Sequence, residues 1–228
     1  MNGRKYYFKS NGNAVAGGHA LIDGIYYVFN KKGQLLAPKN NAVMKVGEKN
    51  YFVTPQGTAV TGWNIYKGKL YYSYKLGRCA SGRKVGDITL EADGAAKDDV
   101  DTQLKLRARE LISQLTTPSM TQDEKLRRCW NWFNTCGFQA SRYPDKSQEN
   151  WPKVCALDML NTKSGNCYGI ANGFAALAKE LGYTPYVIEI PYCHCWVMIN
   201  GRYWDNMGNR MAYPTTRFPY TSDQIYKF

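Results

Sequence analysis

Long apolar runs are what this sequence most plainly lacks. No stretch of its 228 residues approaches the roughly 18 to 20 consecutive apolar residues of a membrane helix, so no membrane span is predicted. Residues 1–12 also lack the apolar core and small-residue cleavage site of a secretory signal. Because the repeats described below begin abruptly at Gly3, we expect a trimmed piece of a longer secreted chain, with Met1 as an added start.

Acidic residues are almost absent from the first part of the chain. Residues 1–86 hold 14 Lys and Arg against two acids, whereas residues 87–228 hold 16 of each sign. All of the net charge of +12 therefore lies in the first part. This break in composition predicts two domains, 1–95 and 96–228, of which the first suits an anionic surface and the second does not.

Paired cysteine motifs and histidines are scarce as well. The seven cysteines form no Cys-x-x-Cys pair, which argues against a disulfide framework and a zinc finger. His194 lies between Cys193 and Cys195, but neighbouring residues of a strand point to opposite faces, so no metal site is predicted. No EF-hand or nucleotide-binding loop occurs, and we expect no cofactor. One cysteine can still be a reactive thiol, with the others as small buried residues.

Four similar units, spaced by 20 to 24 residues, fill the first domain. In each, a glycine precedes a run rich in tyrosine and phenylalanine, and a second glycine closes the unit. The runs are residues 3–8, 24–29, 47–53 and 68–74, and the closing glycines are Gly12, Gly33, Gly57 and Gly77. Short aromatic runs bounded by turn residues are typical of β-hairpins, and one hairpin cannot bury its own aromatic face. The repeats therefore predict a solenoid of stacked β-hairpins.

Residues 62–72, with the sequence GWNIYKGKLYY, show the repeat pattern most clearly. This segment resembles the cell-wall-binding or choline-binding repeats of Gram-positive surface proteins. The resemblance implies an anionic cell-wall polymer or glycan as the partner of the first domain. A choline cage usually needs several aromatic faces, whereas Trp63 is the only tryptophan among the first 86 residues.

Two other interpretations of the repeats stay open at this level. The tyrosines can simply stack one hairpin on the next while the lysines keep the solenoid soluble. Nucleic acid binding would also use basic side chains among aromatics, but these lysines fall mainly in turns and no nucleic-acid-binding motif accompanies them. We therefore expect no nucleic acid partner.

Helical periodicity begins at Asp98 in the second domain. Apolar residues mark one face of a first helix, at Val100, Leu104, Ala108, Leu111, Ile112 and Leu115. A second helix starts with the capping box of Thr121 and Glu124 and is expected to run to Cys136, where Gly137 stops it. Both helices are predicted to face a core.

Cys167 lies in the first turn of a third predicted helix. Apolar residues continue at helical spacing to Leu181, with Ser164 or Asn166 as the cap and Gly182 as the stop. Free backbone amides and the positive end of the helix dipole favour thiolate over thiol at such a position. A cysteine there can also be an ordinary small core residue, so the helix alone does not decide its role.

A predicted hairpin places a histidine beside an aspartate. Residues 186–190 and 194–199 have the pattern of strands, and the turn signal Asn200-Gly201 follows the second of them. A two-residue turn would pair Ile199 with Arg202 and Trp196 with Asp205. His194, Trp196, Tyr203 and Asp205 would then share one face, with Asp205 diagonal to His194 and close enough to orient the imidazole.

The order of these residues resembles the transglutaminase-like superfamily over residues 121–209. Its three motifs stand here as Gly165-Asn-Cys167, His194-Cys-Trp196 and Trp204-Asp205. The resemblance implies a papain-like core, with a helix packed on an antiparallel sheet, and a catalytic triad of Cys167, His194 and Asp205. The expected fold class is α+β: an N-terminal β-hairpin repeat solenoid followed by a papain- and transglutaminase-like α+β domain.

The residue types of this triad predict a thioester mechanism. The Cys167 thiolate would attack a carboxamide or peptide carbonyl, and His194 would protonate the departing amine. The Cys167 backbone amide is one expected oxyanion donor, and Asn161, Trp132 and Gln139 are candidates for the second. Candidate walls of a substrate groove are Trp151, Trp196, Tyr203 and Tyr143, each of which can equally be a core residue.

Taken together, the two domains predict a secreted, cell-envelope-associated thiol enzyme. The first expectation is a cysteine protease or amidase acting on a peptide or protein substrate, such as a peptidoglycan stem peptide or a surface protein. An acyltransferase that joins glutamine to an amine is one alternative. A non-catalytic adhesion module with a relic triad is the other, although relics commonly lose the cysteine or the histidine.

Overall fold

The computed structural model describes residues 3–190, 193–207 and 224–228 and divides the chain into two compact units. The first unit is Met1–Lys97 and the second is Asp98–Phe228. Only β-hairpins occur among the described elements of the first unit, whereas the second combines helices with a sheet, so the expected α+β class with N-terminal hairpins is confirmed. The boundary between the units falls after residue 97, two residues later than the boundary predicted from the sequence.

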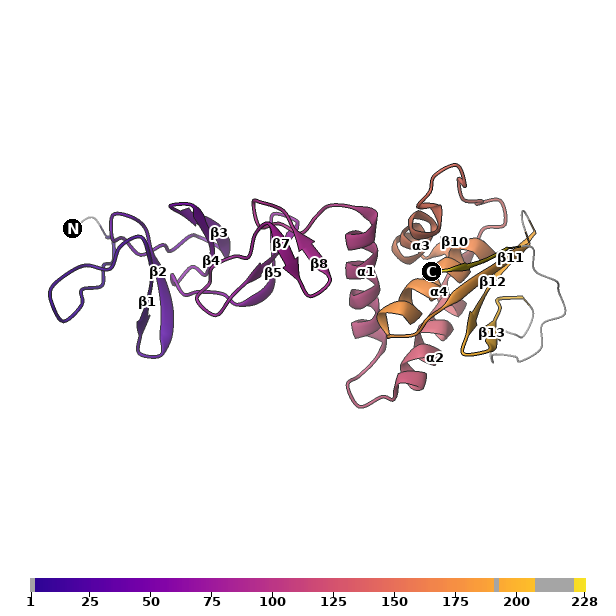
Figure 1. The fold of residues 1–228 in the computed structure, drawn as a ribbon. Coiled ribbons are helices and arrows are strands. Elements are labelled where there is room, and N and C mark those ends of the chain that lie inside the picture. Colours follow the sequence, from indigo (N-terminus) through magenta and orange to yellow (C-terminus); the bar gives the residue numbers. More distant parts are fainter. Residues whose placement is uncertain (1–2, 191–192, 208–223) are drawn as a thin grey trace. The chain divides into compact units, whose positions relative to one another are not determined.

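Four antiparallel hairpins make up the repeat unit (Figure 1). They are β1 (Gly18–Ile22) with β2 (Ile25–Phe29), β3 (Ala42–Val46) with β4 (Lys49–Val53), β5 (Gly62–Tyr66) with β6 (Lys69–Ser73), and β7 (Arg83–Val85) with β8 (Ile88–Leu90). Single bridges tie one hairpin to the segment beyond the next: Tyr27 to Thr58, Tyr51 to Arg78 and Tyr71 to Ala95. Each hairpin is thus held by its neighbour.

The closing glycines are required by the backbone and by these contacts. Gly57 has a φ of +82° and Gly77 a φ of +75°, backbone conformations that residues other than glycine rarely adopt. A Cβ atom at Gly57 would lie 2.6 Å from the Leu35 side chain, and one at Gly77 would lie 2.6 Å from Ala59 Cβ. Glycine therefore lets one repeat close against the preceding one.

The first and last repeats differ from the expectation. Residues 3–14 contain only one bridge, Phe8 to Ala14, in place of a full hairpin. The hairpin β7–β8 forms instead where the aromatic pattern fades, with Ile88 and Leu90 buried. The tyrosine pattern does not extend to this repeat, because its buried side chains are aliphatic.

The second unit contains the helices α1 (Val100–Leu115), α2 (Gln122–Trp132), α3 (Trp151–Thr162) and α4 (Cys167–Glu180). Asp99 caps α1 by accepting from the Thr102 amide, and the predicted capping box of Thr121 and Glu124 starts α2. The α2 helix is shorter than expected, because it ends at Trp132 and continues as the 3₁₀ turn η1 (Phe133–Thr135). Cys136 is therefore extended and half-buried, while Cys129 is fully buried.

The α3 helix was not predicted from the sequence. Its buried residues are Ala156, Met159 and Leu160. Pro152 in its first turn and the helical spacing of Trp151, Val154 and Cys155 are the local signals that indicate this helix.

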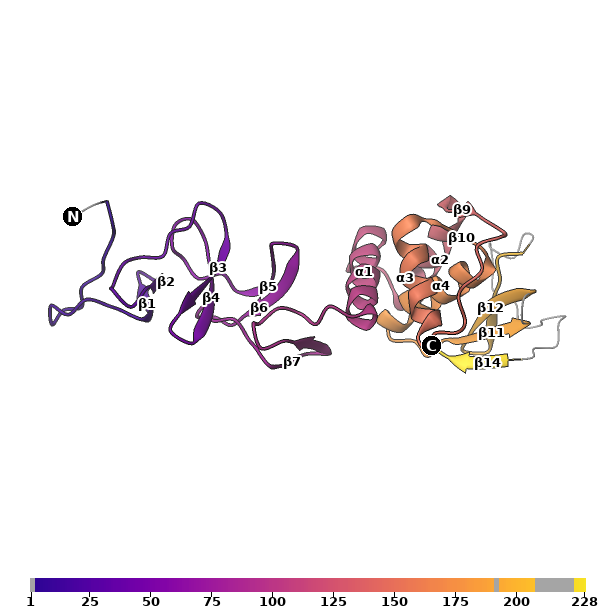
Figure 2. The same cartoon turned by 90° about the horizontal axis from the view of Figure 1, so that it is seen from above.

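A four-stranded antiparallel sheet completes the second unit, in the order β13 (Arg202–Trp204), β12 (His194–Ile199), β11 (Tyr186–Ile190), β14 (Gln224–Lys227). A short parallel pair is formed by β9 (Gly137–Phe138), which precedes α3, and β10 (Ser164–Gly165), which directly precedes α4. The α4 helix packs against β12 and against the other three helices (Figures 1 and 2). The core is therefore centred on α4. Among the described residues no helix is long and apolar enough to cross a membrane.

Candidate active site

The start of α4 places Cys167 at the edge of the core. Asn166 is the N-cap, and its side-chain oxygen accepts from the Tyr168 amide at 3.0 Å. Met159 of α3 packs closely beneath this turn, because a Cβ atom at Gly165 would lie 2.8 Å from the Met159 sulfur. Cys167 is the first helical residue and is buried, so its thiol faces the interior next to the positive end of the helix.

The hairpin of β12 and β13 has the register expected from its turn. Ile199 pairs with Arg202 and Val197 with Trp204. Asn200 and Gly201 have φ values of 50° and 73°, the left-handed conformations that a tight hairpin turn of this kind requires. Asp205 follows directly and reaches the same face as His194.

A buried hydrogen bond joins His194 to Asp205. The Nε2 atom of the imidazole lies 2.7 Å from Asp205 Oδ1, and the two residues are only 4% and 1% exposed. The backbone amide of Met207 also donates to Asp205 Oδ1, at 3.1 Å. Trp196 stacks on the imidazole at 5.5 Å between ring centroids and an angle of 26°. The ring is held in one orientation by the aspartate at its edge and the indole on its face.

The side chain of Cys167 lies close enough to His194 to interact with its imidazole. Burial opposes protonation of the imidazole, but the hydrogen bonds and negative charges of Asp205 and Cys167 outweigh it and raise the pKa of His194 to about 9. His194 therefore carries its proton at neutral pH. The structure brings the three residues together in the order cysteine, histidine, aspartate.

Comparison with known proteins agrees with this arrangement, since the sequence pattern of the transglutaminase-like superfamily matches residues 108–204. These residues form a transglutaminase-like domain. No curated protein matches the chain closely enough to count as a relative.

Solved structures of choline-binding proteins from Streptococcus pneumoniae resemble the N-terminal region. CbpJ is 19% identical over 42% of this chain and 39% of its own, with a TM-score of 0.30. Choline binding protein F is 25% identical over 43% and 39%, with a TM-score of 0.24. The modular autolysin LytC, solved with a synthetic peptidoglycan ligand, is 22% identical over 41% and 26%, with a TM-score of 0.26. The chain spans about two fifths of CbpJ, and TM-scores this low carry no argument about its ligands.

Burial changes the acidity of three other thiols of the transglutaminase-like domain. Burial raises the pKa of Cys129 and of Cys155 to about 12, and the pKa of the fully buried Cys195 is also raised by burial. Cys155 and Cys195 lie close enough to Cys167 for their charges to interact. These three thiols therefore stay protonated at neutral pH. Cys167, by contrast, lies beside the imidazole of His194.

The residues expected to wall a substrate groove divide into two groups. Trp196 is buried on His194, so it supports the imidazole, and the expectation of a groove wall is wrong for this residue. Tyr203 is half-buried opposite Met198. Trp151 and the exposed Tyr143 both lie edge-on to Tyr168, at 6.2 and 5.9 Å. Trp151 and Tyr143 therefore lie beside the residue that follows Cys167.

Of the three candidates for the second oxyanion donor, Gln139 is connected to the segment that precedes α4. The backbone amide of Gln139 donates to the Gly165 carbonyl at 2.9 Å, as a continuation of the β9–β10 pair. Asn161 is exposed near the end of α3, and Trp132 is buried against the Phe133 ring at 5.0 Å. Only Gln139 is thus tied by a hydrogen bond to the motif that contains Cys167, within the part of the chain that is described.

A buried ion pair near this site was not predicted. Lys146 Nζ lies 2.9 Å from Glu189 Oε2, and Glu189 is only 1% exposed. The same ammonium lies over the rings of Tyr168 and Trp151, at 4.6 and 5.1 Å. The ion pair fastens the loop between β9 and α3 to β11, and the contact with the Tyr168 ring fastens it to the start of α4. The signal in the sequence was a glutamate inside the apolar strand 186–190.

No group of three His, Cys, Asp or Glu side chains within the described ranges could hold a metal ion. Cys193 is exposed and Cys195 is buried, on either side of His194.

Proposed function

We propose that the transglutaminase-like domain is a thiol hydrolase that cleaves a peptide or carboxamide bond through a thioester. The observation that carries this proposal is the imidazole of His194, which hydrogen-bonds Asp205 and interacts with the nearby side chain of Cys167. A protonated imidazole beside the sulfur stabilises a thiolate, the nucleophilic form of cysteine.

The first half of the reaction forms the acyl-enzyme. The Cys167 sulfur bonds to the carbonyl carbon, and the carbon–nitrogen bond then breaks as His194 gives its proton to the departing amine. In the second half His194 takes a proton from water, whose oxygen attacks the thioester. The products are a carboxylic acid and the regenerated pair of Cys167 and His194. Asp205 fixes the tautomer of the imidazole throughout and supports its positive charge.

The oxyanion of each tetrahedral intermediate needs donors in fixed positions. The backbone amide of Cys167 is available because the first amides of a helix have no partner within it. We assign the second donor to the Gln139 side chain, since its backbone is held against Gly165. Together the two donors would stabilise the negative charge of the oxyanion.

The repeat unit is proposed to hold the enzyme on the cell envelope of a secreting organism. Its basic side chains outnumber acidic ones by 14 to 2 over residues 1–86. The partly exposed rings of Trp63, Tyr72 and Tyr74 form a continuous edge-to-face series, with centroids 5.1 and 5.6 Å apart. Positive charge beside exposed aromatic faces suits an anionic polymer or glycan of the wall, and the substrate would then be a wall peptide or a surface protein.

Acyl-enzyme trapping tests this proposal. Wild-type protein is incubated with peptidoglycan stem peptides and with glutamine-containing peptides, quenched in acid, and analysed by intact mass. A mass increase at Cys167 and release of free acid are expected, and both should vanish in Cys167→Ala but persist in Cys155→Ala, which removes a neighbouring thiol. An added primary amine captured in place of water would instead support the acyltransferase. An unchanged mass with every peptide would contradict catalysis and favour the adhesion module.

A further inference from the structure

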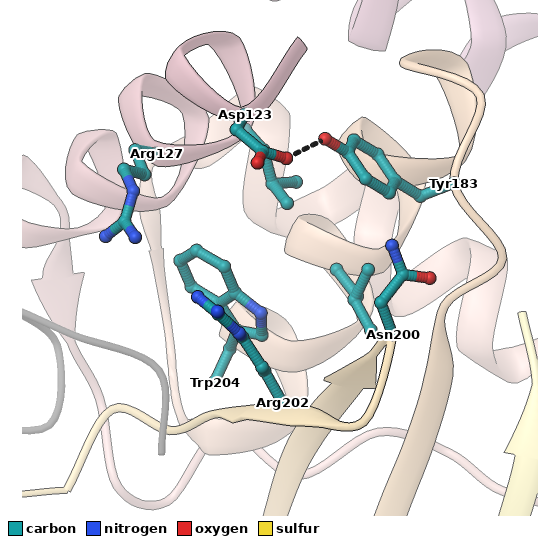
Figure 3. Close-up of a pocket in the computed structure, with 8 residues that line it drawn as sticks. Asp123, Arg127, Tyr183, Asn200, Arg202 and Trp204 are labelled. Atoms are coloured by element: carbon teal, nitrogen blue, oxygen red, sulfur yellow. Dashed lines mark hydrogen bonds between the residues drawn. The ribbon is translucent and has the colours of Figure 1, made fainter. Parts of the chain in front are cut away.

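A cavity of about 290 Å³ lies at the end of β12 that is remote from His194 (Figure 3). Its lining comes from α2, from the segment before β11 and from the β12–β13 hairpin: Asp123, Leu126, Arg127, Tyr183, Ile199, Asn200, Arg202 and Trp204. Five strand positions separate His194 from Ile199, which corresponds to about 16 Å at 3.3 Å per residue. The cavity is therefore distinct from the triad.

The wall of this cavity contains a buried donor for which the described residues provide no acceptor. Trp204 is 5% exposed, and its Nε1 atom has no hydrogen-bond partner among the described residues. Figure 3 shows the indole nitrogen on the edge of the ring that faces Asn200. Leaving a polar N–H buried without a partner is unfavourable, and an acceptor that enters the cavity would remove that penalty.

The charged residues of the lining leave a net positive charge. The lining includes two guanidinium groups, of Arg127 and Arg202, and one carboxylate, of Asp123. Tyr183 donates its hydroxyl proton to this carboxylate at 2.6 Å, as the dashed line in Figure 3 marks. Within the described ranges neither arginine forms an ion pair. The cavity thus combines two available arginine side chains with the indole N–H.

We propose that this cavity binds a carboxylate-bearing ligand of amino-acid or short-peptide size. Its carboxylate accepts from the Trp204 indole and pairs with Arg127 and Arg202, whose planar guanidinium groups match a planar carboxylate. A net charge of one suits a monoanion better than a phosphate dianion. The tight turn at Asn200 and Gly201 fixes the position of Arg202. The site goes beyond the proposed function, because its ligand makes no contact with Cys167.

Nuclear magnetic resonance of the indole N–H groups tests the site independently of activity. The Trp204 resonance is assigned as the one lost in Trp204→Phe, a change that keeps an aromatic ring between Trp130 and Phe174. The probes are N-acetyl-L-alanine, its uncharged amide and inorganic phosphate. Titration with N-acetyl-L-alanine is expected to shift the Trp204 resonance saturably, while the amide leaves it unmoved.

Variants of exposed residues decide whether the two arginines take part. Arg127→Gln and Arg202→Gln should each weaken binding of N-acetyl-L-alanine by roughly tenfold, the effect of about 1.4 kcal/mol. Arg128→Gln, on the same helix but outside the cavity, should bind as wild type does. An unshifted Trp204 resonance, or equal affinity in all three variants, would overturn the proposal. Tighter binding of phosphate than of N-acetyl-L-alanine would overturn the assignment of the ligand as a carboxylate.

Discussion

The repeat unit and the transglutaminase-like unit bury their cores in different ways. The repeat unit has small separate clusters, such as Val28, Val46, Tyr51 and Val53. The second unit has one continuous core to which all four helices and the sheet contribute. Truncating a core side chain of the repeat unit therefore disturbs one or two hairpins, whereas the same change in the second unit reaches the elements that hold the triad.

Buried polar groups show the same contrast. Ser73 is the buried polar residue of the described part of the repeat unit, whereas the second unit buries Thr102, Asn166, Asn172, Glu189, His194 and Asp205. Burying charged groups is costly unless they are paired, and here His194 pairs with Asp205 and Glu189 with Lys146. The described part of the repeat unit has no buried pair of charged side chains. In the second unit both pairs lie near Cys167.

Removal of the nucleophile has the largest expected effect and separates the two units by function. Cys167→Ala should lower the rate of peptide hydrolysis by about 10⁴-fold or more, with binding through the repeats unchanged. Rates with a cleavable stem peptide and sedimentation with cell walls measure the two properties. Cys155→Ala is the matched control. Loss of wall binding in Cys167→Ala would contradict the assignment of catalysis to the second unit and of wall binding to the repeats.

Truncation of one phenylalanine in each unit compares the two cores. Phe174→Ala removes a fully buried ring of α4 and should cost about 3–5 kcal/mol in the unfolding of the second unit. Phe52→Ala, also buried, should cost less because its small cluster can close over the gap. Calorimetry and denaturant titration measure the loss of unfolding free energy in each variant. If Phe52→Ala destabilised both units equally, the cores would not be separate.

Loss of the proposed oxyanion donor should reduce the rate without unfolding either unit. Gln139→Ala is expected to lower kcat by about 10²-fold with little change in KM, because the donor acts mainly in the transition state. Gln148→Ala, in the same loop, should retain wild-type kcat. A change confined to KM would show that Gln139 binds substrate instead.

The pH dependence of the second unit should report His194. Its pKa is raised to about 9, so the imidazole keeps its proton through neutral pH and loses it as the pH rises through that value. The kcat/KM should then fall about tenfold per pH unit above 9, since no proton remains for the departing amine. Asp205→Asn removes a charge that raises this pKa and should move the fall to lower pH. An unmoved fall would contradict the role of Asp205.

Local patterns predicted the features that rest on a few neighbouring residues. The turn Asn200-Gly201 fixed the register of β12 and β13 and with it the position of Asp205. The capping box at Thr121 and the cap at Asn166 started α2 and α4 where expected. Each of these depends on contacts within five residues.

Features that depend on distant contacts were missed. The ion pair of Lys146 and Glu189 joins residues 43 positions apart, and the sequence offered only an unexplained charge in a strand. Trp196 appeared suited to a groove, but whether an aromatic side chain faces solvent or covers an imidazole depends on the whole sheet. The cavity around Trp204 likewise needs three elements to meet, so no local pattern could indicate it.

The pH dependence of Cys167 alkylation by iodoacetamide, followed by peptide mass spectrometry, tests whether His194 activates Cys167. Wild type, His194→Ala and His194→Gln are compared, and the exposed Cys193 serves as an internal reference thiol in each digest. We expect rapid alkylation of Cys167 well below a pH of about 8.5, the ordinary pKa of a free thiol, and loss of that reactivity in both variants while Cys193 is unaffected. If Cys167 reacts no faster than Cys193 in wild type, or reacts equally in all three proteins, His194 does not activate it and the proposed enzyme is contradicted.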